Sequence, residues 1–229
     1  MKTIGLLGGM SWESTLTYYR VINEEIKQAL GGYHSAKIVL YSVDFAEIEA
    51  YQTSGEWDKS AQVLTTAAQA LEMGGADFVL ICTNTMHKVA PQVQAGIHVP
   101  LLHIAEATAA LLNEQGIGKV ALLGTKYTMT QDFYKDKLIE AGIEVLVPDP
   151  QGIEEMNRII FEELCLGTIS EDSRSRCLEI IRALENRGAQ GVVLGCTEIG
   201  LLIEQQHTRL PVFDTALIHA SKAAQLALS

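Results

Sequence analysis

The sequence lacks any cluster of lysine and arginine residues, and its formal net charge is −11. Such a charge balance repels nucleic-acid phosphates and anionic membrane surfaces, so we expect no nucleic acid and no membrane as partners. No apolar run is long enough for a signal peptide or a membrane helix. With only five prolines and no low-complexity segment, the chain is not expected to contain long disordered stretches.

Cysteine is also sparse, and the spacing of the cysteines argues against both a disulfide framework and a zinc site. The four cysteines show neither a CxxC pair nor the dense pattern of a disulfide framework, so we expect reduced thiols in a cytoplasmic protein. His87 follows Cys82 by five residues without a second Cys/His pair, which is poor evidence for zinc. No metal site is predicted.

The chain has 229 residues, 48% of them hydrophobic, which is enough for one large domain or two small ones. Short apolar runs alternate with segments of helical spacing, such as residues 16–30 and 61–71, each followed by a glycine pair. This alternation is typical of parallel sheets covered by helices, so the predicted fold class is α/β. The predicted strands are residues 3–7, 36–43, 76–82, 99–104, 120–124, 144–147 and 191–195.

An internal repeat divides the chain. The segment ALEMGGADFVLICTNT (70–85) aligns with ALENRGAQGVVLGCTE (183–198) at an offset of 113, and TIGLLGG (3–9) aligns with KVALLGT (119–125) at 116. We interpret the near-equal offsets as two similar α/β lobes; chance matching of helices rich in Ala, Leu and Glu is the alternative. The predicted lobes are residues 1–98 plus 212–229, and residues 99–211.

The repeat also indicates which residue of the Cys82-Thr83 pair is the counterpart of Cys196. At an offset of 113, Thr83 aligns with Cys196, whereas Cys82 aligns with Gly195. Successive strand residues point to opposite faces of a sheet. We therefore predict that Thr83 and Cys196 occupy equivalent places at the ends of equivalent strands. Cys82 is predicted to pack inside its own lobe.

Ligands of open α/β sheets bind beyond the carboxyl ends of the strands, where this sequence offers one candidate thiolate. We expect Cys196 to be reactive, because a helix N-terminus after its strand would lower the pKa of the thiol. Nearby hydroxyl and amide side chains are suited to hold a carboxylate; they are Asn84, Thr85, Thr125 and Thr197. The Gly8-Gly9 turn lacks the GxGxxG and GKS/T patterns of nucleotide sites.

Several other polar and aromatic residues have simpler structural interpretations. Cysteines after apolar runs are usually small core residues. Histidines near the ends of helices or strands are usually satisfied by hydrogen bonds. An acid in the first turn of a helix usually complements the helix dipole. Aromatic residues on the first helix are interpreted as packing residues. The residues concerned are Cys82, Cys165, Cys177, His103, His219, Glu198, Trp12, Tyr18 and Tyr19.

Three motifs, GLLGGMSWEST, CTNTMH and LGCTEIGLLI, together with LPVFDT near the end, resemble the aspartate/glutamate racemase family over nearly the whole chain. The resemblance implies two similar α/β lobes with the active site in the cleft between them, an amino acid as substrate, and no cofactor. It also implies one cysteine from each lobe on opposite faces of the amino acid. One thiolate removes the α-proton and the opposite thiol returns a proton, the minimum needed for a direct inversion.

The sequence departs from this pattern at the first cysteine, which in the family usually stands immediately before the Asn-Thr pair. Here Thr83 holds that place, and a hydroxyl is a weaker acid than a thiol and a poor base unless activated. By the same resemblance, Cys165 stands where some aspartate-specific members carry a lysine, and Gln52 where an arginine can occur. Neutral and polar amino acids therefore remain open as substrates beside acidic ones.

The leading hypothesis is a cofactor-independent amino-acid racemase with Cys196 as the principal acid/base and Thr83 opposite it. Met10 and Gln52 would line the other end of the substrate. A lyase-like enzyme is the alternative, because one thiol can reprotonate one face of an enolate after decarboxylation. A non-catalytic amino-acid-binding relative is a third hypothesis, because the thiol pair is broken. We also expect a homodimer.

Overall fold

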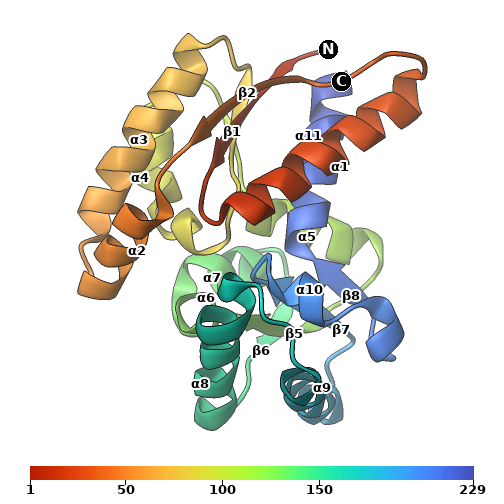
Figure 1. The fold of residues 1–229 in the computed structure, drawn as a ribbon. Helices are drawn as coiled ribbons and strands as arrows, with labels where there is room; N and C mark the ends of the chain where they lie inside the picture. The colour runs from red at the N-terminus through yellow and green to blue at the C-terminus, as the bar shows by residue number, and fades with distance from the viewer. The chain divides into compact units, whose positions relative to one another are not determined.

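Two four-stranded parallel sheets organise the chain, one in each of two compact units (Figure 1). The computed structural model describes residues 1–229; unit 1 consists of Met1–Ile104 and Ala216–Ser229, and unit 2 of Ala105–Thr215. The predicted fold class, α/β with two similar sheet-and-helix lobes, is confirmed. Our boundaries at 98/99 and 211/212 remain a prediction about separately folding domains.

The sheet of unit 1 has the strand order β2-β1-β3-β4, and each neighbouring pair is parallel. Side chains of the central strands alternate between two apolar clusters. Leu7 and Ile81 pack with residues of α3, while Leu6 and Leu80 pack with residues of α1 and α11. The elements are β1 (Thr3–Gly8), α1 (Trp12–Leu30), β2 (Lys37–Ser42), α2 (Phe45–Ser54), α3 (Trp57–Met73), β3 (Phe78–Ile81), η1 (Thr85–Val89), α4 (Ala90–Ala95), β4 (Leu101–Leu102) and α11 (Thr215–Leu228).

Helix α1 buries a different face from the one that its large apolar residues predict. Tyr18 is fully buried as expected, but the packing roles predicted for Trp12 and Tyr19 are wrong, because these side chains are 60% and 52% exposed. Leu16 lies on the same stripe at helical spacing and is 57% exposed. The inward face instead begins with small polar residues, since β1 approaches so closely that a Cβ on Gly8 would clash with the Thr15 side chain. The buried residues of α1 are Ser14, Thr15, Tyr18, Ile22 and Ile26.

Unit 2 repeats the topology of unit 1, with the strand order β6-β5-β7-β8 and parallel pairing throughout. Strands β1 and β5 coincide at the offset of 116, and β3 and β7 begin at the offset of 113, so the sequence repeat is a structural duplication. The elements are α5 (Ile104–Glu114), β5 (Lys119–Gly124), α6 (Lys126–Thr130), α7 (Asp132–Glu140), β6 (Glu144–Leu146), α8 (Pro150–Arg158), α9 (Glu171–Asn186), β7 (Gly191–Gly195), α10 (Ile199–Leu202), η4 (Gln205–His207) and β8 (Val212–Asp214).

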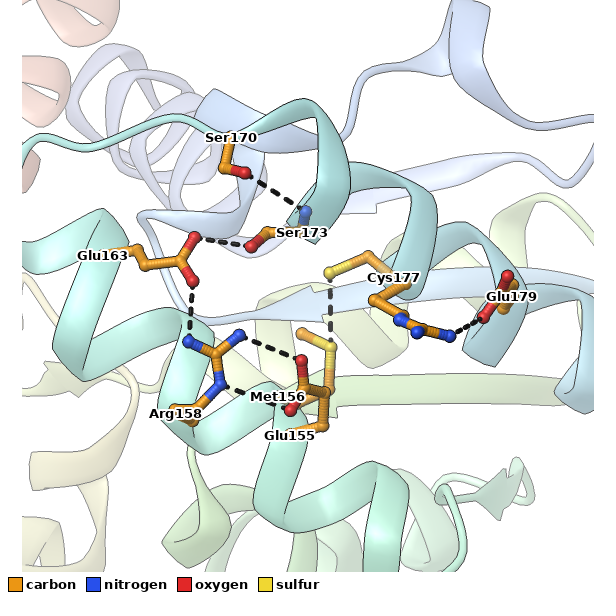
Figure 2. Close-up of polar contacts among 9 residues, drawn as sticks. Glu155, Met156, Arg158, Glu163, Ser170, Ser173, Cys177 and Glu179 are labelled. Atoms are coloured by element: carbon orange, nitrogen blue, oxygen red, sulfur yellow. Dashed lines mark hydrogen bonds and ion pairs between the residues drawn. The ribbon is translucent and has the colours of Figure 1, made fainter.

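Helix α8 continues through a π-helical turn, η2 (Ile159–Glu163), into a short 3₁₀ turn, η3 (Leu164–Leu166). A hydrogen-bonded cluster fixes this bend (Figure 2). Arg158 bonds to Glu155 at 2.9 Å and to Glu163 at 2.8 Å, and Glu163 also accepts from the Ser173 hydroxyl at the start of α9. The Ser173 bond, followed by Arg158, lowers the pKa of Glu163. The bend therefore brings Cys165 against the apolar cluster that contains Cys196.

No helix in the chain is both long enough and apolar enough to cross a membrane. All four cysteines are free thiols.

Candidate active site

The carboxyl ends of β1 and β3 carry the candidate residues of unit 1. The chain leaves β1 through Gly9, whose φ of +96° and close approach to the Val43 carbonyl leave no room for a Cβ and so admit only glycine. The Gly9 amide donates to the Thr15 hydroxyl at 2.9 Å, and the Ser14 hydroxyl donates to the Cys82 carbonyl at 3.1 Å. The first turn of α1 thus ties the ends of β1 and β3 together.

Thr83, Asn84 and Thr85 follow β3 after one intervening residue, Cys82, and form the strand-end triplet of unit 1. Thr83 is partly exposed, whereas Asn84 and Thr85 are more than nine-tenths buried. The structure therefore places the three predicted residues at one strand end. Their contact with a substrate remains a prediction.

Cys82 lies outside this triplet, between β3 and Thr83. It is fully buried in the apolar cluster with Leu6 and Tyr18, and burial raises the pKa of its thiol far above the usual range. A thiol in this position is not ionised near neutral pH. The structural role that strand alternation predicts for Cys82 agrees with this position.

Met10 and Gln52, predicted to line the far end of a substrate, are both buried in unit 1. Met10 is 2% exposed and packs into the apolar cluster that includes α3. Gln52 is 5% exposed and lies near the end of α2. Met10 shares the carboxyl end of the sheet with Thr83, while Gln52 belongs to the helix that follows β2. Their substrate contacts also remain predictions.

In unit 2 the equivalent strand end carries Cys196, Thr197 and Glu198, the strand-end triplet of this unit. The Cys196 thiol donates to Glu198 Oε2 at 3.0 Å, and the Thr197 hydroxyl donates to the same oxygen at 2.8 Å. Cys196 is 9% exposed and Glu198 is 8% exposed. Since a buried carboxylate and a thiol share a proton-carrying hydrogen bond here, the pair can move a proton between sulfur and oxygen.

The pKa of Cys196 is raised well above its usual value, opposite to the shift that its strand-end position predicts. Burial is the largest cause, followed by the negative charge of Glu198 and the hydrogen bond to it; Cys165 adds a smaller effect. The helix that follows, α10, has only four residues and supplies little dipole. The resting side chain is therefore a thiol, and our expectation of a lowered pKa is wrong.

Glu198 is a functional candidate that the sequence pattern alone does not identify, because it is typical of a first-turn helix acid. It actually occupies the N-cap position of α10 without making a side-chain cap, and its carboxylate turns back to the thiol. The signal that could have found it is a carboxylate two residues after a cysteine at a strand end.

Thr125 follows β5, in the place that Gly9 occupies after β1. It is 5% exposed, and its hydroxyl accepts from the Thr128 amide at 3.3 Å as the N-cap of α6. Because β5 and β7 are paired neighbours, Thr125 and Cys196 share the carboxyl edge of one sheet. The structure brings Thr125, Cys196 and Thr197 together, and their roles toward a substrate remain predictions.

Known proteins resemble this chain over its whole length. A family profile described as Asp/Glu/Hydantoin racemase matches residues 7–223. A solved structure from Yersinia pestis, proposed to be an Asp/Glu racemase, is 56% identical with a TM-score of 0.95, and all of both chains is covered. An aspartate racemase homologue from Pyrococcus horikoshii is 40% identical with a TM-score of 0.87, again over 100% of both chains. A broad-specificity amino-acid racemase from Bacillus subtilis is 21% identical over 93% of this chain and 92% of its own.

The matches cover the sheets of both units and the two strand-end triplets. The resemblance that the sequence motifs carry is thereby confirmed. The chain belongs to the Asp/Glu/hydantoin racemase family.

Proposed function

We propose that this protein is an amino-acid racemase, an isomerase that inverts the α-carbon of an amino acid without a cofactor. The observation that carries the proposal is the buried Cys196 thiol bonded to Glu198, at the strand end equivalent to that of Thr83. Family membership supports the reaction class. The equivalence of the two strand ends supports pairing Cys196 with Thr83 on opposite faces of the α-carbon.

In the proposed reaction Glu198 accepts the thiol proton of Cys196, and the resulting thiolate removes the α-proton of the substrate. The carbanion then receives a proton on its other face from the Thr83 hydroxyl or from a water that Thr83 positions. In the reverse direction the Cys196 thiol donates its proton to the carbanion. One proton leaves the α-carbon and another arrives, and proton exchange with water returns Thr83 to its hydroxyl and Glu198 to its carboxylate before the next turnover.

The substrate carboxylate is proposed to bind to hydroxyl and amide groups of the two strand edges. The residues are Asn84, Thr85, Thr125 and Thr197, with Met10 and Gln52 toward the side chain. Neither Gln52 nor Cys165 carries a positive charge, so neither neutralises an acidic substrate side chain. We therefore propose that the substrates include polar and neutral amino acids, in keeping with the broad specificity named for the Bacillus subtilis relative.

The proposal is tested by incubating the protein with each enantiomer of the common amino acids and separating the products by chiral chromatography. Cys196→Ser should lower D/L interconversion about 10³-fold or more, because the hydroxyl is a much poorer base at neutral pH. Cys177→Ser is the control, since Cys177 is buried in the core beside Met156. Wild-type turnover in Cys196→Ser would end the proposal.

The same assay separates the alternatives. Release of CO₂ without inversion would indicate a lyase-like enzyme, and saturable binding without turnover would indicate a non-catalytic relative. Activity should persist in a metal chelator, and the protein should show no absorbance above the aromatic band. Activity that a chelator removes and added metal restores would contradict the cofactor-independent reaction.

We also propose a cytoplasmic homodimer. Trp12, Leu16 and Tyr19 form an exposed apolar stripe on α1, and exposed stripes of this kind are favourable surfaces for a second copy. Light scattering on the purified protein should give twice the chain mass, and Leu16→Lys should shift it toward the monomer. A wild-type monomer at micromolar concentration would exclude the dimer.

A further inference from the structure

The imidazole of His87 holds the backbone of Thr83 in place. His87 is 1% exposed, and its Nδ1 lies 2.8 Å from the Thr83 carbonyl oxygen. Its Nε2 lies 3.2 Å from the amide nitrogen of Ile104, which follows β4 and begins α5. One side chain therefore connects the ends of β3 and β4 on the carboxyl side of the sheet.

The two partners fix the tautomer of this ring. The Ile104 amide can only donate, so Nε2 must accept with its lone pair. The Thr83 carbonyl can only accept, so Nδ1 must carry the proton and donate it. His87 is thus a neutral Nδ1–H imidazole, and neither its protonated form nor its other tautomer satisfies both bonds.

Other buried groups around the ring keep it neutral. The ring of His103 lies 4.5 Å from it between centroids and that of His219 lies 5.8 Å away. His219 is itself fixed, because Nε2 donates to the Leu102 carbonyl and Nδ1 accepts from the Tyr18 hydroxyl, both at 2.8 Å. Burial, followed by these two imidazoles, lowers the pKa of His87 well below its usual value.

Unit 2 has no counterpart of this arrangement. At the offset of 113, His87 corresponds to Gly200, and the strand pairing places His103 where unit 2 has Asp214. A Cβ on Gly200 would clash with Asp214 Oδ2, so the position admits no larger side chain without a shift. At the unit 2 strand end the Cys196 thiol bonds to Glu198 of the same triplet. At the unit 1 strand end His87 bonds to the backbone carbonyl of Thr83.

We propose that His87 is a positioning residue for Thr83 in the racemase reaction, an inference that rests on the proposed function. Threonine is β-branched and has few allowed side-chain rotamers, so fixing its backbone carbonyl limits its hydroxyl to a few directions. A weak acid/base such as a hydroxyl depends on its placement, because a shift of about 1 Å can cost about 10²-fold in rate. The Nδ1–H bond supplies that placement.

Two substitutions separate the two hydrogen bonds of His87. In His87→Asn the amide nitrogen occupies the place of Nδ1 and can still donate to Thr83. In His87→Gln the longer side chain reaches the place of Nε2 and can accept from Ile104, but the donor to Thr83 is lost. His34→Gln is the matched control, since His34 is exposed in the same unit.

The readout is exchange of the α-proton for deuterium in D₂O, followed by NMR for each enantiomer separately. Thr83→Ala identifies the enantiomer whose exchange depends on Thr83. His87→Gln should slow the exchange of that enantiomer about tenfold or more, and should change the exchange rate of the opposite enantiomer by no more than about twofold. His87→Asn should recover most of that loss. Equal loss for both enantiomers in both variants would show that His87 only fills the core, and would overturn the proposal.

A second measurement does not depend on turnover. In protein labelled with ¹⁵N-histidine, long-range ¹H–¹⁵N NMR should show His87 as the neutral Nδ1–H tautomer from pH 7 to pH 5. His87→Gln should also shift the Thr83 resonances more than His87→Asn does. An Nε2–H tautomer or an imidazolium at pH 6 would overturn the proposal. If the wild-type protein exchanges no amino acid while the tautomer is as expected, the racemase function fails and the bond to Thr83 stands.

Discussion

The two units share one topology but secure their strand-end triplets in different ways. In unit 2 both Cys196 and Thr197 donate to Glu198, so the proposed acid/base group and its proposed proton acceptor come from the same turn. In unit 1 the backbone of Thr83 is held from outside the triplet by His87. The same fold thus supports a self-contained thiol–carboxylate pair at one end and a hydroxyl on a fixed backbone at the other.

This difference shows which features a duplicated fold retains. Strand order and the register of the central strands are the same in both units, because β1, β3, β5 and β7 are buried on both faces and a slip of one residue would misplace their apolar side chains. The residues after the strands are free of that constraint. They can diverge in chemistry while remaining in equivalent places.

The largest expected change comes from making the two strand ends alike. Thr83→Cys places a thiol at the unit 1 triplet, and we expect it to raise the slower direction of proton exchange about 10²-fold, because a thiol is a far better acid/base than a hydroxyl near neutral pH. Isotope exchange at the α-carbon, measured for each enantiomer, checks this. Cys82→Ala should leave both rates nearly unchanged, since Cys82 is fully buried in the apolar core of unit 1. If Cys82→Ala removes activity and Thr83→Ala does not, the assigned register is off by one residue.

The second prediction concerns Glu198, the carboxylate of the unit 2 triplet; the unit 1 triplet contains no carboxylate. Glu198→Gln removes a negative charge beside Cys196, and that charge is one cause of the raised thiol pKa. The pKa of Cys196 should therefore fall, so that the midpoint for its alkylation moves to lower pH and the rate at pH 7 rises severalfold. Iodoacetamide labelling followed by mass spectrometry measures this midpoint. Turnover should fall at the same time, because glutamine cannot accept the thiol proton. An unchanged alkylation midpoint would show that the charge of Glu198 does not affect the pKa of Cys196.

The third prediction concerns two buried histidines of unit 1, His87 and His219, whose cluster has no counterpart in unit 2. Burial lowers the pKa of His219 to about 3, and that of His87 lies well below its usual value, so both bind protons on unfolding below pH 6.5. Their contribution to stability is present above pH 6.5 and is lost as the pH falls. Below pH 6.5 each should lower the free energy of unfolding with a slope that approaches about 1.4 kcal/mol per pH unit by pH 5.

Urea unfolding monitored by circular dichroism at several pH values tests this slope. His219→Gln removes one titrating group and should reduce the histidine part of the slope by about half. The mutant should be less stable than wild type at pH 7, since the Tyr18 hydroxyl loses its acceptor. An identical slope in wild type and mutant would show that His219 is not buried in its neutral form.

Local sequence patterns were sufficient for the features that depend on periodicity and the repeat. The alternation of apolar runs predicts seven of the eight strands. It does not predict β8, in which only Val212 and Phe213 stand between Pro211 and Asp214. The packing interpretation of Trp12 and Tyr19 is wrong because two stripes at helical spacing compete on α1, and the choice depends on the close approach of Gly8 to Thr15. Such an approach is set by tertiary packing.

The chemistry of the candidate site was less accessible from sequence. The position of Cys196 was predicted from the repeat, but the direction of its pKa shift depends on burial and on the orientation of Glu198. The role of His87 depends on Ile104, which lies 17 residues away along the chain. Side-chain partners that meet only in the folded unit leave no periodic signal in the sequence.

The central claim is that a thiol acts from unit 2 and a hydroxyl from unit 1, and isotope exchange tests it most directly. For wild-type protein in D₂O, the initial rates of α-proton exchange should differ between the two enantiomers of the same amino acid, although the final mixture of free enantiomers must be one to one. Cys196→Ser should abolish the faster exchange. Equal rates for the two enantiomers, or a faster exchange that survives in Cys196→Ser, would contradict the claim.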